Sequence, residues 1–338
     1  MLKFSIIIAS FNGKKLLREC MRSVFETKYP SFEVIVVDDG SVDGSIKVIR
    51  EFQKKHPLIL IQNERNLGLV ASRNKAIQKA KGEILVFLDN DTKVDKNWLG
   101  GLIDVFSDES VGAAQCKIFD FHKVKIIQEI GMKLIPYTGF GTTLGRGEKD
   151  KGQYNTPVEI ISLGAALAVK KDVTQLVGDF DQKLFHYTDD LDFSWRIWIS
   201  GKRVVSAPNS KVYHYTHIHK PTYKLYYNLS KNSLRMILKN YETFNVIKYL
   251  PLSIIFNIAG GIFVLFTKGN IIALLGVLVG LGWNIFNSVD TFNERSKVNK
   301  FRRVGDSQIF PKIMIQGNIF TFYKRYFRLA KLTDTLVK

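Results

Sequence analysis

The sequence predicts an α/β fold in which a mixed, mostly parallel sheet is followed by a C-terminal helical hairpin. Three observations predict it. Strand-like apolar runs alternate with segments of helical spacing, polar segments follow each of these runs, and two nearly charge-free stretches lie between residues 249 and 289. With 338 residues and 46% hydrophobic content, the chain is long enough to bury a substantial core.

Four apolar, β-branched runs in the first ninety residues are expected to be strands: 4–9 (FSIIIA), 32–38 (FEVIVVD), 58–62 (LILIQ) and 83–89 (EILVFLD). The segments between them have apolar residues at helical spacing, and this alternation is typical of parallel strands covered on both faces. In such sheets ligands bind beyond the carboxyl ends of the strands. The polar segments that follow the runs, ASFNG, DDGSVDGS, NERNLG and LDNDT, should therefore face one crevice.

Residues 112–160 are less regular. Residues 138–155 are rich in glycine and charge, which suits a mobile loop over a site. Leu191, Phe193, Ile197 and Trp198 predict a helix that ends near Gly201. The two cysteines follow no disulfide or metal-site spacing.

The formal charge of +18 is concentrated in the C-terminal part, because residues 193–338 contain 22 Lys and Arg but only 5 Asp and Glu. Such an excess is typical of proteins that bind nucleic acid or an anionic membrane surface. A non-enzymatic membrane- or nucleic-acid-binding protein is therefore one interpretation. It does not account for the acidic clusters, and the neighbouring apolar stretches favour a membrane over nucleic acid.

Two acidic clusters carry candidate chemistry. Asp89 and Asp91 end a predicted strand, where they could share Mg²⁺ or Mn²⁺, and the metal with a diphosphate would balance their charge. The same spacing also fits a solvated turn. The second cluster is TDDLD, with Asp189, Asp190 and Asp192 at a helix start, a position that the helix dipole alone favours for acids.

Several motifs agree in order and spacing: SIIIASFNG, EVIVVDDGSVDGS, NLGLVASRNKAI and LVFLDND, followed by TDDLDFSWRIWISGKRVVSAPNSKVYHY. Together they resemble the family 2 inverting glycosyltransferases of the GT-A type, over roughly the first 215 residues. The resemblance implies a Rossmann-like, nucleotide-sugar-binding GT-A fold. It also implies metal-dependent, inverting transfer of a sugar from a nucleotide-diphosphate sugar to an acceptor hydroxyl, with Mg²⁺ or Mn²⁺ as cofactor and no nucleic-acid partner.

On the donor side, the resemblance implies a role for five residues. The backbone around Ala9 and the ring of Phe11 would line the base pocket, and Asp39 would form a hydrogen bond with the base. Arg73 would lie near the base and diphosphate. Asp89 would face the ribose.

On the reaction side, the resemblance implies that Asp91 binds the metal and that Asp190 is the general base for the acceptor hydroxyl. Asp189 would contact the acceptor, although the family more often has the longer glutamate there. His214 would be a further metal ligand; a purely structural histidine is the alternative.

Other enzyme classes fit less well. The acid pair of a receiver domain follows its first strand, whereas DDGS follows the second strand here, and ASFNGKK lacks the glycine-rich, arginine-containing loop of a sugar nucleotidylyltransferase. The Gln-x-x-Arg-Trp motif of processive polysaccharide synthases does not occur in the 338-residue sequence, which favours transfer of a single sugar.

The apolar stretches at 249–267 and 271–289 have 19 residues each, or about 28 Å as helices, which nearly matches a ~30 Å hydrocarbon core. Basic residues flank the pair, so we expect a membrane hairpin with the catalytic domain on the cytoplasmic side of the cell membrane and a lipid-linked or glycan acceptor. Pro251, Asn257 and the pair Gly260 and Gly261 weaken the first stretch, so an interfacial hairpin is the alternative.

The expected domains follow from these boundaries. They are a catalytic domain (1–220), basic amphipathic connecting helices (221–248), the membrane hairpin (249–289) and a basic C-terminal tail (290–338). A chain that ends near Lys239 is expected to be soluble.

Overall fold

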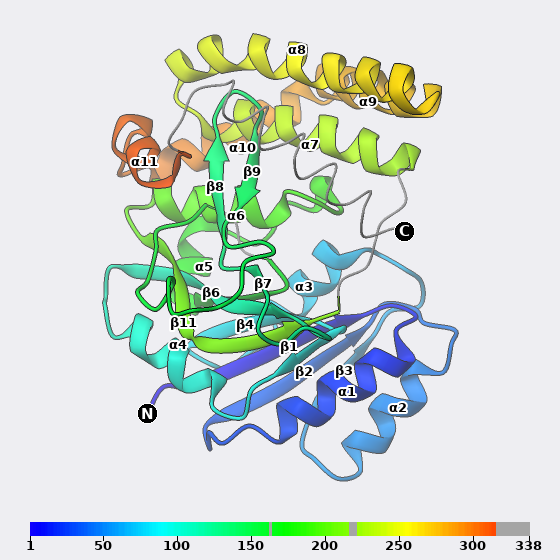
Figure 1. Cartoon of the computed structure of the whole chain (residues 1–338), viewed down its shortest axis with the longest axis vertical. Helices are drawn as coiled ribbons and strands as arrows, with labels where there is room; N and C mark the ends of the chain where they lie inside the picture. The colour runs from blue at the N-terminus through cyan, green and yellow to red at the C-terminus, as the bar shows by residue number, and fades with distance from the viewer. Residues whose placement is uncertain (162–163, 216–221, 316–338) are drawn as a thin grey trace.

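The computed structural model describes residues 1–161, 164–215 and 222–315, and a twisted sheet forms its centre (Figure 1). The strand order is β3-β2-β1-β4-β10-β6-β11-β5, with β7 paired to β6. The strands are β1 (Phe4–Ser10), β2 (Phe32–Asp38), β3 (Ile59–Gln62), β4 (Ile84–Asp89), β5 (Thr92–Val94), β6 (Val111–Asp120), β7 (Ile127–Glu129), β10 (Ala166–Lys170) and β11 (Arg203–His214).

The predicted fold class is confirmed. Strands β1 to β4 are mutually parallel, and they coincide with the four apolar runs of the sequence. Strand β10 is antiparallel to both β4 and β6, and β6 is parallel to β11, so β6 and β11 run in the same direction as β1 to β4. The carboxyl ends of β1, β2 and β4 therefore meet at one edge of the sheet.

Helices cover both faces of the sheet because side chains alternate along each strand. Ile6 and Ile8 of β1 pack toward one face, and Ile7 packs toward the other. The first face is covered by α1 (Lys14–Phe25), α2 (Ser45–Gln53) and α4 (Trp98–Phe106). The second is covered by α3 (Leu69–Ile77), α5 (Lys171–Val177) and α6 (Asp189–Ile199), and the short 3-10 helix η1 (Gln182–Leu184) precedes α6.

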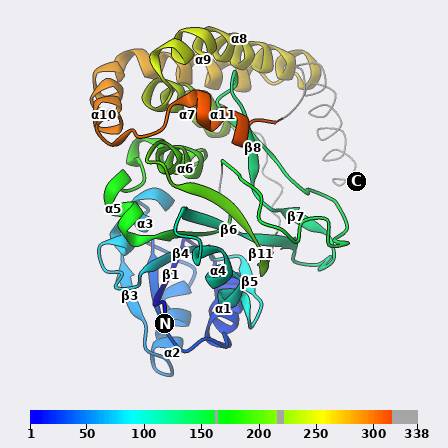
Figure 2. The same cartoon turned by 90° about the vertical axis from the view of Figure 1, so that its left-hand side faces the viewer.

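The C-terminal helices form layers beyond α6 (Figures 1 and 2). Helix α7 (Tyr223–Asn240) lies next to α6, and the hairpin of α8 (Thr243–Lys268) and α9 (Ile271–Phe286) lies beyond α7. A two-stranded ribbon, β8 (Met132–Ile135) and β9 (Phe140–Thr143), reaches up to the hairpin, where the Ser253 hydroxyl donates to the carbonyl of Thr138. The predicted helical hairpin is thus present.

Small residues let α9 lie directly on the backbone of α7. A Cβ atom on Gly280 would lie 2.5 Å from the carbonyl oxygen of Tyr227, and one on Gly276 would lie 2.9 Å from that of Tyr223. The Asn284 side-chain amide donates to the carbonyl of Lys231 at 3.1 Å. These contacts place α9 alongside α7 and in the same direction, so the hairpin is fixed to α7.

Among the described residues, α8 is the one single helix long and apolar enough to cross a membrane, and 17% of its apolar window is buried. Helix α9 is shorter, and it is bent by 68° from the following helix α10 (Ser288–Phe301). The outer face of α8 leaves large apolar side chains exposed, including Ile255, Phe263 and Phe266.

Residues 290–313 differ from the expected basic tail, because α10 packs onto α7 and α11 (Asp306–Ile313) packs onto α6. Ile309, Phe310 and Ile313 are buried in the same core as Trp195 of α6 and Tyr241. Apolar residues at helical spacing are interspersed with the basic ones here, and the burial of the apolar set decides the structure. Residues 316–338 of the expected tail lie outside the described part of the chain.

Phe310→Ala should therefore lower the free energy of unfolding by about 3–5 kcal/mol, because it empties a core position between Trp195 and Tyr241. Phe292→Ala, at an exposed position of α10, is the matched control and should change it by less than about 0.5 kcal/mol. Urea unfolding at a fixed detergent concentration measures the free energy of unfolding of both variants.

A chain ending at Lys239 loses this packing, so we expect it to be unfolded rather than soluble and folded. A cooperative unfolding transition in that chain would contradict the assignment of α10 and α11 to the core.

Candidate active site

A hollow of about 490 Å³ lies at the carboxyl ends of β1, β2 and β4. It is lined by six of the residues that sequence analysis selected: Ala9, Phe11, Asp39, Asp89, Asp91 and His214. The other three, Arg73, Asp189 and Asp190, do not line the hollow itself. Residues from β1 to β11 thus converge on one crevice, as the positions of the strand ends predict.

Asp89, Asp91 and His214 form a cluster in which one ligand atom from each lies within 4.8 Å of the others. Strand pairing produces this arrangement, because Thr92 of β5 pairs with His214 of β11 and Asp89 ends β4. The His214 Nε2 lies 3.3 Å from an oxygen of Asp91. Burial lowers the pKa of His214, but the hydrogen bond and charge of Asp91, with the charge of Asp89, outweigh it and raise the pKa.

Two carboxylates and an imidazole suit Mn²⁺, and carboxylates suit Mg²⁺. Gln128 supports this use of His214. Its Nε2 lies 2.8 Å from His214 Nδ1, and its buried Oε1 has no hydrogen-bond partner among the described residues. Turning the amide by 180° lets Oε1 accept from Nδ1–H, which leaves the Nε2 lone pair directed at the cluster. The residues present therefore fit a divalent cation.

Asp39 holds a neighbouring loop as well as lining the hollow. Its carboxylate accepts hydrogen bonds from the Asn63 side chain at 2.8 Å and from the backbone amides of Leu67 and Gly68, each at 2.9 Å. Gly68 adopts a φ of 90°, and a Cβ atom there would lie 2.7 Å from the ring of Phe185. Asp39 therefore fixes the 63–68 loop that borders the site.

Arg73 of α3 is buried between the two acidic clusters. Its guanidinium lies 3.1 Å from Asp89 and 3.2 Å from Asp189, and it also lies 5.5 Å from the ring centroid of Phe180. Burial raises the pKa of both carboxyl groups, and the charge of Arg73 opposes that rise. The positive partner of the strand-end acids is thus a side chain that also holds the start of α6.

The three acids of TDDLD have different surroundings. Asp189 is buried against Arg73, and Asp192 is fully buried against Lys239 and Arg196 at 2.7 and 3.1 Å. Asp190 is half-buried at the first turn of α6. Asp190 is thus the most accessible of the three.

The segment before α6 has an unusual backbone. Phe185, Tyr187 and Thr188 have positive φ values of 60°, 67° and 58°, although none is glycine. Each such residue costs roughly 1–3 kcal/mol and persists only where surrounding contacts hold it. Phe185 and His186 line the hollow. Sequence analysis missed them, because side chains in this conformation carry no compositional signal.

Sequence analysis also missed Gln128, Glu129 and Arg146. Arg146 lines the hollow from the glycine-rich 138–155 segment, and a lone arginine among those glycines was the available signal. Glu129 is buried, with its carboxylate 3.2 Å from the Gln115 amide. Burial raises the pKa of Glu129 to about 7; the Gln115 hydrogen bond opposes this, and the charge of Asp190 adds to it.

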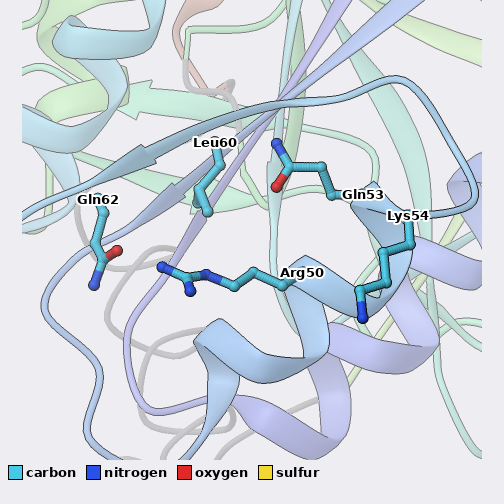
Figure 3. A pocket seen from close by; sticks show the side chains of 5 residues that line it. All are labelled: Arg50, Gln53, Lys54, Leu60 and Gln62. Atoms are coloured by element: carbon cyan, nitrogen blue, oxygen red, sulfur yellow. The ribbon is translucent and has the colours of Figure 1, made fainter.

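A second hollow, of about 560 Å³, lies between α2 and the edge strand β3 (Figure 3). Arg50, Gln53 and Lys54 line it from the helix, and Leu60 and Gln62 from the strand. These five residues include no acid and belong to neither acidic cluster. Both acidic clusters therefore lie apart from this second hollow.

Comparison with protein families gives two overlapping matches. Residues 5–156 match the profile described as glycosyl transferase family 2. Residues 84–286, more than half of the chain, match the profile described as glycosyl transferase family group 2.

Relatives of similar sequence have glycosyltransferase names. An uncharacterized glycosyltransferase, YfnE of Bacillus subtilis (strain 168), is 29% identical over 213 residues, covering 60% of this chain and 53% of YfnE. A poly-beta-1,6-N-acetyl-D-glucosamine synthase of Staphylococcus epidermidis is 26% identical over 207 residues, covering 61% of this chain and 48% of the synthase. The chain thus spans about half the length of these relatives.

Solved structures share the fold at low sequence identity. GalNAc-T7 with UDP, GalNAc and Mn²⁺ has a TM-score of 0.60 and 20% identity, over 72% of this chain and 49% of that one. Residues 1–349 of S. aureus TarS with UDP-GlcNAc have a TM-score of 0.58 and 17% identity, over 89% and 91%. The mannosyltransferase PcManGT of Pyrobaculum calidifontis with GDP-Man and Mn²⁺ has a TM-score of 0.54 and 18% identity, over 89% and 86%.

The raised pKa of Glu129 predicts a pH-dependent stability. The unfolded carboxyl loses its proton near pH 4.5 and the folded one near pH 7, so between these values the folded state holds more protons. The contribution of Glu129 to the free energy of unfolding should therefore fall by about 3 kcal/mol as the pH rises from 4.5 to 7.

Glu129→Gln should remove that fall, because the amide keeps its size and carries no charge. Urea unfolding of the metal-free protein between pH 5 and pH 8 measures the difference. Glu64→Gln, at an exposed acid, is the control and should keep the wild-type profile. Parallel profiles for Glu129→Gln and the wild type would show that Glu129 ionises normally.

Proposed function

This chain belongs to glycosyl transferase family 2, and from that premise we propose that it is a metal-dependent, inverting glycosyltransferase. It transfers a single sugar from a nucleotide-diphosphate sugar to an acceptor hydroxyl. The observation that carries the proposal is the pairing of two sites through Arg73. The cluster of Asp89, Asp91 and His214 lies on one side of it, and the acids that begin α6 lie on the other.

The donor would occupy the hollow at the strand ends. Phe11 and Ala9 border the part next to Asp39 and would contact the base. Asp91 and His214, with Asp89 beside them, would hold Mg²⁺ or Mn²⁺, which supplies positive charge to the leaving diphosphate. Arg146 lines the same hollow and adds a second positive charge for the phosphates. The UDP, UDP-GlcNAc and GDP-Man of the structural neighbours support a nucleotide-sugar donor.

Asp190 is the proposed general base. Its carboxylate takes the proton of the acceptor hydroxyl as that oxygen attacks the anomeric carbon, while the bond between that carbon and the diphosphate oxygen breaks. Attack on the face opposite the leaving group gives inversion. Asp189 and Asp192 are less suited to this role, because each is buried against cationic side chains. We assign Asp189 to positioning Arg73 and the start of α6, next to the acceptor.

We further propose that the enzyme works on the cytoplasmic face of the cell membrane, with a lipid-linked glycan or another membrane-associated acceptor. The hairpin supports attachment at the interface rather than a full crossing. Helix α9 has 16 residues, or about 24 Å, which is shorter than the ~30 Å hydrocarbon core. It also packs along α7, whose Lys224, Lys231, Arg235 and Lys239 would be costly to bring into hydrocarbon.

The exposed apolar side chains of α8 and α9 are then the surface that enters the lipid. They include Ile255, Phe263 and Phe266 on α8 and Leu275, Leu278 and Val279 on α9. The charge of the C-terminal region favours anionic lipid head groups.

The non-enzymatic alternative, a nucleic-acid- or membrane-binding protein, draws on the same basic region. Arg235 and Lys239 of α7 are buried in ion pairs with Asp181 at 2.8 and 2.7 Å, so neither contributes a surface cation. That interpretation also leaves the two acidic clusters without a role.

The proposed roles of Asp190 and Asp91 predict that replacing each by the isosteric asparagine affects a different property. Asp190→Asn should lower sugar transfer by roughly 100-fold or more while Mn²⁺-dependent nucleotide binding persists, because only the proton acceptor is lost. Asp91→Asn should weaken Mn²⁺-dependent nucleotide binding itself. Calorimetry with UDP and GDP in Mn²⁺, and a radiolabelled panel of nucleotide sugars with membrane lipid extract, measure the two properties. Full transfer in excess chelator, or by Asp190→Asn, would reject the mechanism.

The proposed interfacial hairpin predicts that its turn stays on the side of the catalytic domain. Both native cysteines are buried, so Lys268→Cys would introduce an accessible thiol at the turn. A membrane-impermeant maleimide should label it in inverted membrane vesicles and not in intact cells. Lys47→Cys, on exposed α2, is the matched control for the cytoplasmic side. Labelling of Lys268→Cys only from outside intact cells would mean that the hairpin spans the bilayer.

A further inference from the structure

We propose that Asn232 of α7 is a positioning residue that holds the segment from Leu184 to Tyr187 as a wall of the donor hollow. The effect on donor binding rests on the proposed function, whereas the effect on the segment does not. Nothing in the acidic motifs points to this asparagine, which lies more than forty residues along the chain from the segment.

The contact is a branched hydrogen bond, in which the two N–H groups of one side-chain amide are shared among three carbonyl acceptors. The Asn232 side-chain amide donates to the carbonyl oxygens of Leu184, His186 and Tyr187 at 3.0, 3.0 and 2.8 Å. Its neighbour Lys231 donates to the carbonyl of Lys183 at 2.5 Å. One turn of α7 therefore binds the carbonyl groups of four of the five residues from 183 to 187.

The segment needs an external support. Phe185, Tyr187 and the following Thr188 all have positive φ values, and none is the glycine that would adopt them without strain. Strain of this kind relaxes unless neighbouring groups fix the backbone. The carbonyl groups that Asn232 binds lie within or next to this strained stretch, so the amide is placed to resist that relaxation.

The burial of Asn232 supports a dedicated role. Its side chain is fully buried, and its Oδ1 has no hydrogen-bond partner among the described residues. A buried acceptor without a partner is unfavourable, and a leucine of similar size would avoid it. The presence of an asparagine at this buried position is explained by its side-chain N–H groups, which have three carbonyl acceptors.

The position of the segment affects the site directly. The Phe185 ring lies against Gly68, and Phe185 and His186 both line the donor hollow. Helix α6 begins with Asp189 and Asp190 just after the segment. Relaxation of residues 184–187 would shift the wall of the hollow and the first turn of α6 together.

Hydrogen exchange of the full-length, metal-free protein in detergent tests the support itself. Asn232→Ala should speed exchange at least tenfold for the amides of Leu184, Phe185 and Asp192, which donate to Asp181, Gln182 and Thr188. The amide of Tyr241, at the end of α7, should keep its wild-type rate. The matched control is Asn284→Ala, another buried asparagine, which donates to the carbonyls of Lys231 and Gly280 and to none of the segment. Unchanged exchange at 184–192, or equal acceleration throughout α7, would overturn the proposal.

Calorimetry with Mn²⁺ and UDP or GDP then tests the consequence. Asn232→Ala should bind the nucleotide that the wild type binds about tenfold more weakly, and Asn284→Ala should bind it normally. Unchanged affinity despite faster local exchange would overturn the link to the donor hollow. If the wild type binds neither nucleotide, the proposed donor site is wrong. The hydrogen-exchange result would still show whether Asn232 holds residues 184–187 in place.

Two further variants test the proposal even if Asn232→Ala does not fold. Asn232→Ser keeps one hydroxyl donor, so it should give intermediate exchange rates even if Asn232→Ala does not fold. Thr188→Gly removes strain at a positive φ, so adding it to Asn232→Ser should slow exchange of the Leu184 and Phe185 amides toward the wild-type rate. No slowing in the double variant would contradict the role of strain.

Discussion

The site depends on one buried cation shared by two carboxylates. Arg73 comes from α3, Asp89 from the end of β4 and Asp189 from the start of α6, so a single guanidinium joins three elements that are far apart in the sequence. Without it, the carboxylates of Asp89 and Asp189 would repel one another in a poorly solvated place. The aromatic rings of Phe87 and Phe180 lie beside the guanidinium and keep it in position. The distance between the two halves of the site is thus set by one side chain.

Much of the fold followed from the sequence, because its strongest signals are local. The runs 4–9, 32–38, 58–62 and 83–89 are strands, and the polar segments after them meet in one crevice. The convergence of Asp89, Asp91 and His214 was expected from resemblance rather than from spacing, since β5 and β11 pair across more than a hundred residues. Local patterns identify the elements, and only long-range pairing brings the ligands together.

The features that sequence analysis missed depend on contacts that leave no local pattern. Phe185, Tyr187 and Thr188 have positive φ values in a segment whose carbonyl groups are bound by Asn232 of α7, and Gln128 is recognised only by its position beside His214. The basic C-terminal region was interpreted as surface, yet Arg235 and Lys239 are buried against Asp181, and Lys239 also against Asp192. Charge counts do not tell a buried cation from an exposed one. For the same reason, α10 and α11 were expected to be a tail.

In the proposed attachment at the interface, the stacking of α9 on α7, and of α7 on α6, would set the height of α6 above the lipid. Neighbouring helices pack with their axes roughly 8–10 Å apart, so two such layers hold the first turn of α6 about 20 Å from the axis of α9. With the hairpin at the interface, an acceptor hydroxyl must stand that far out of the bilayer to reach Asp190. A bare lipid head group is too short for this, so the arrangement favours a head group that already carries an extended glycan. The rigid helical layers would then select acceptors that are long enough to reach the site.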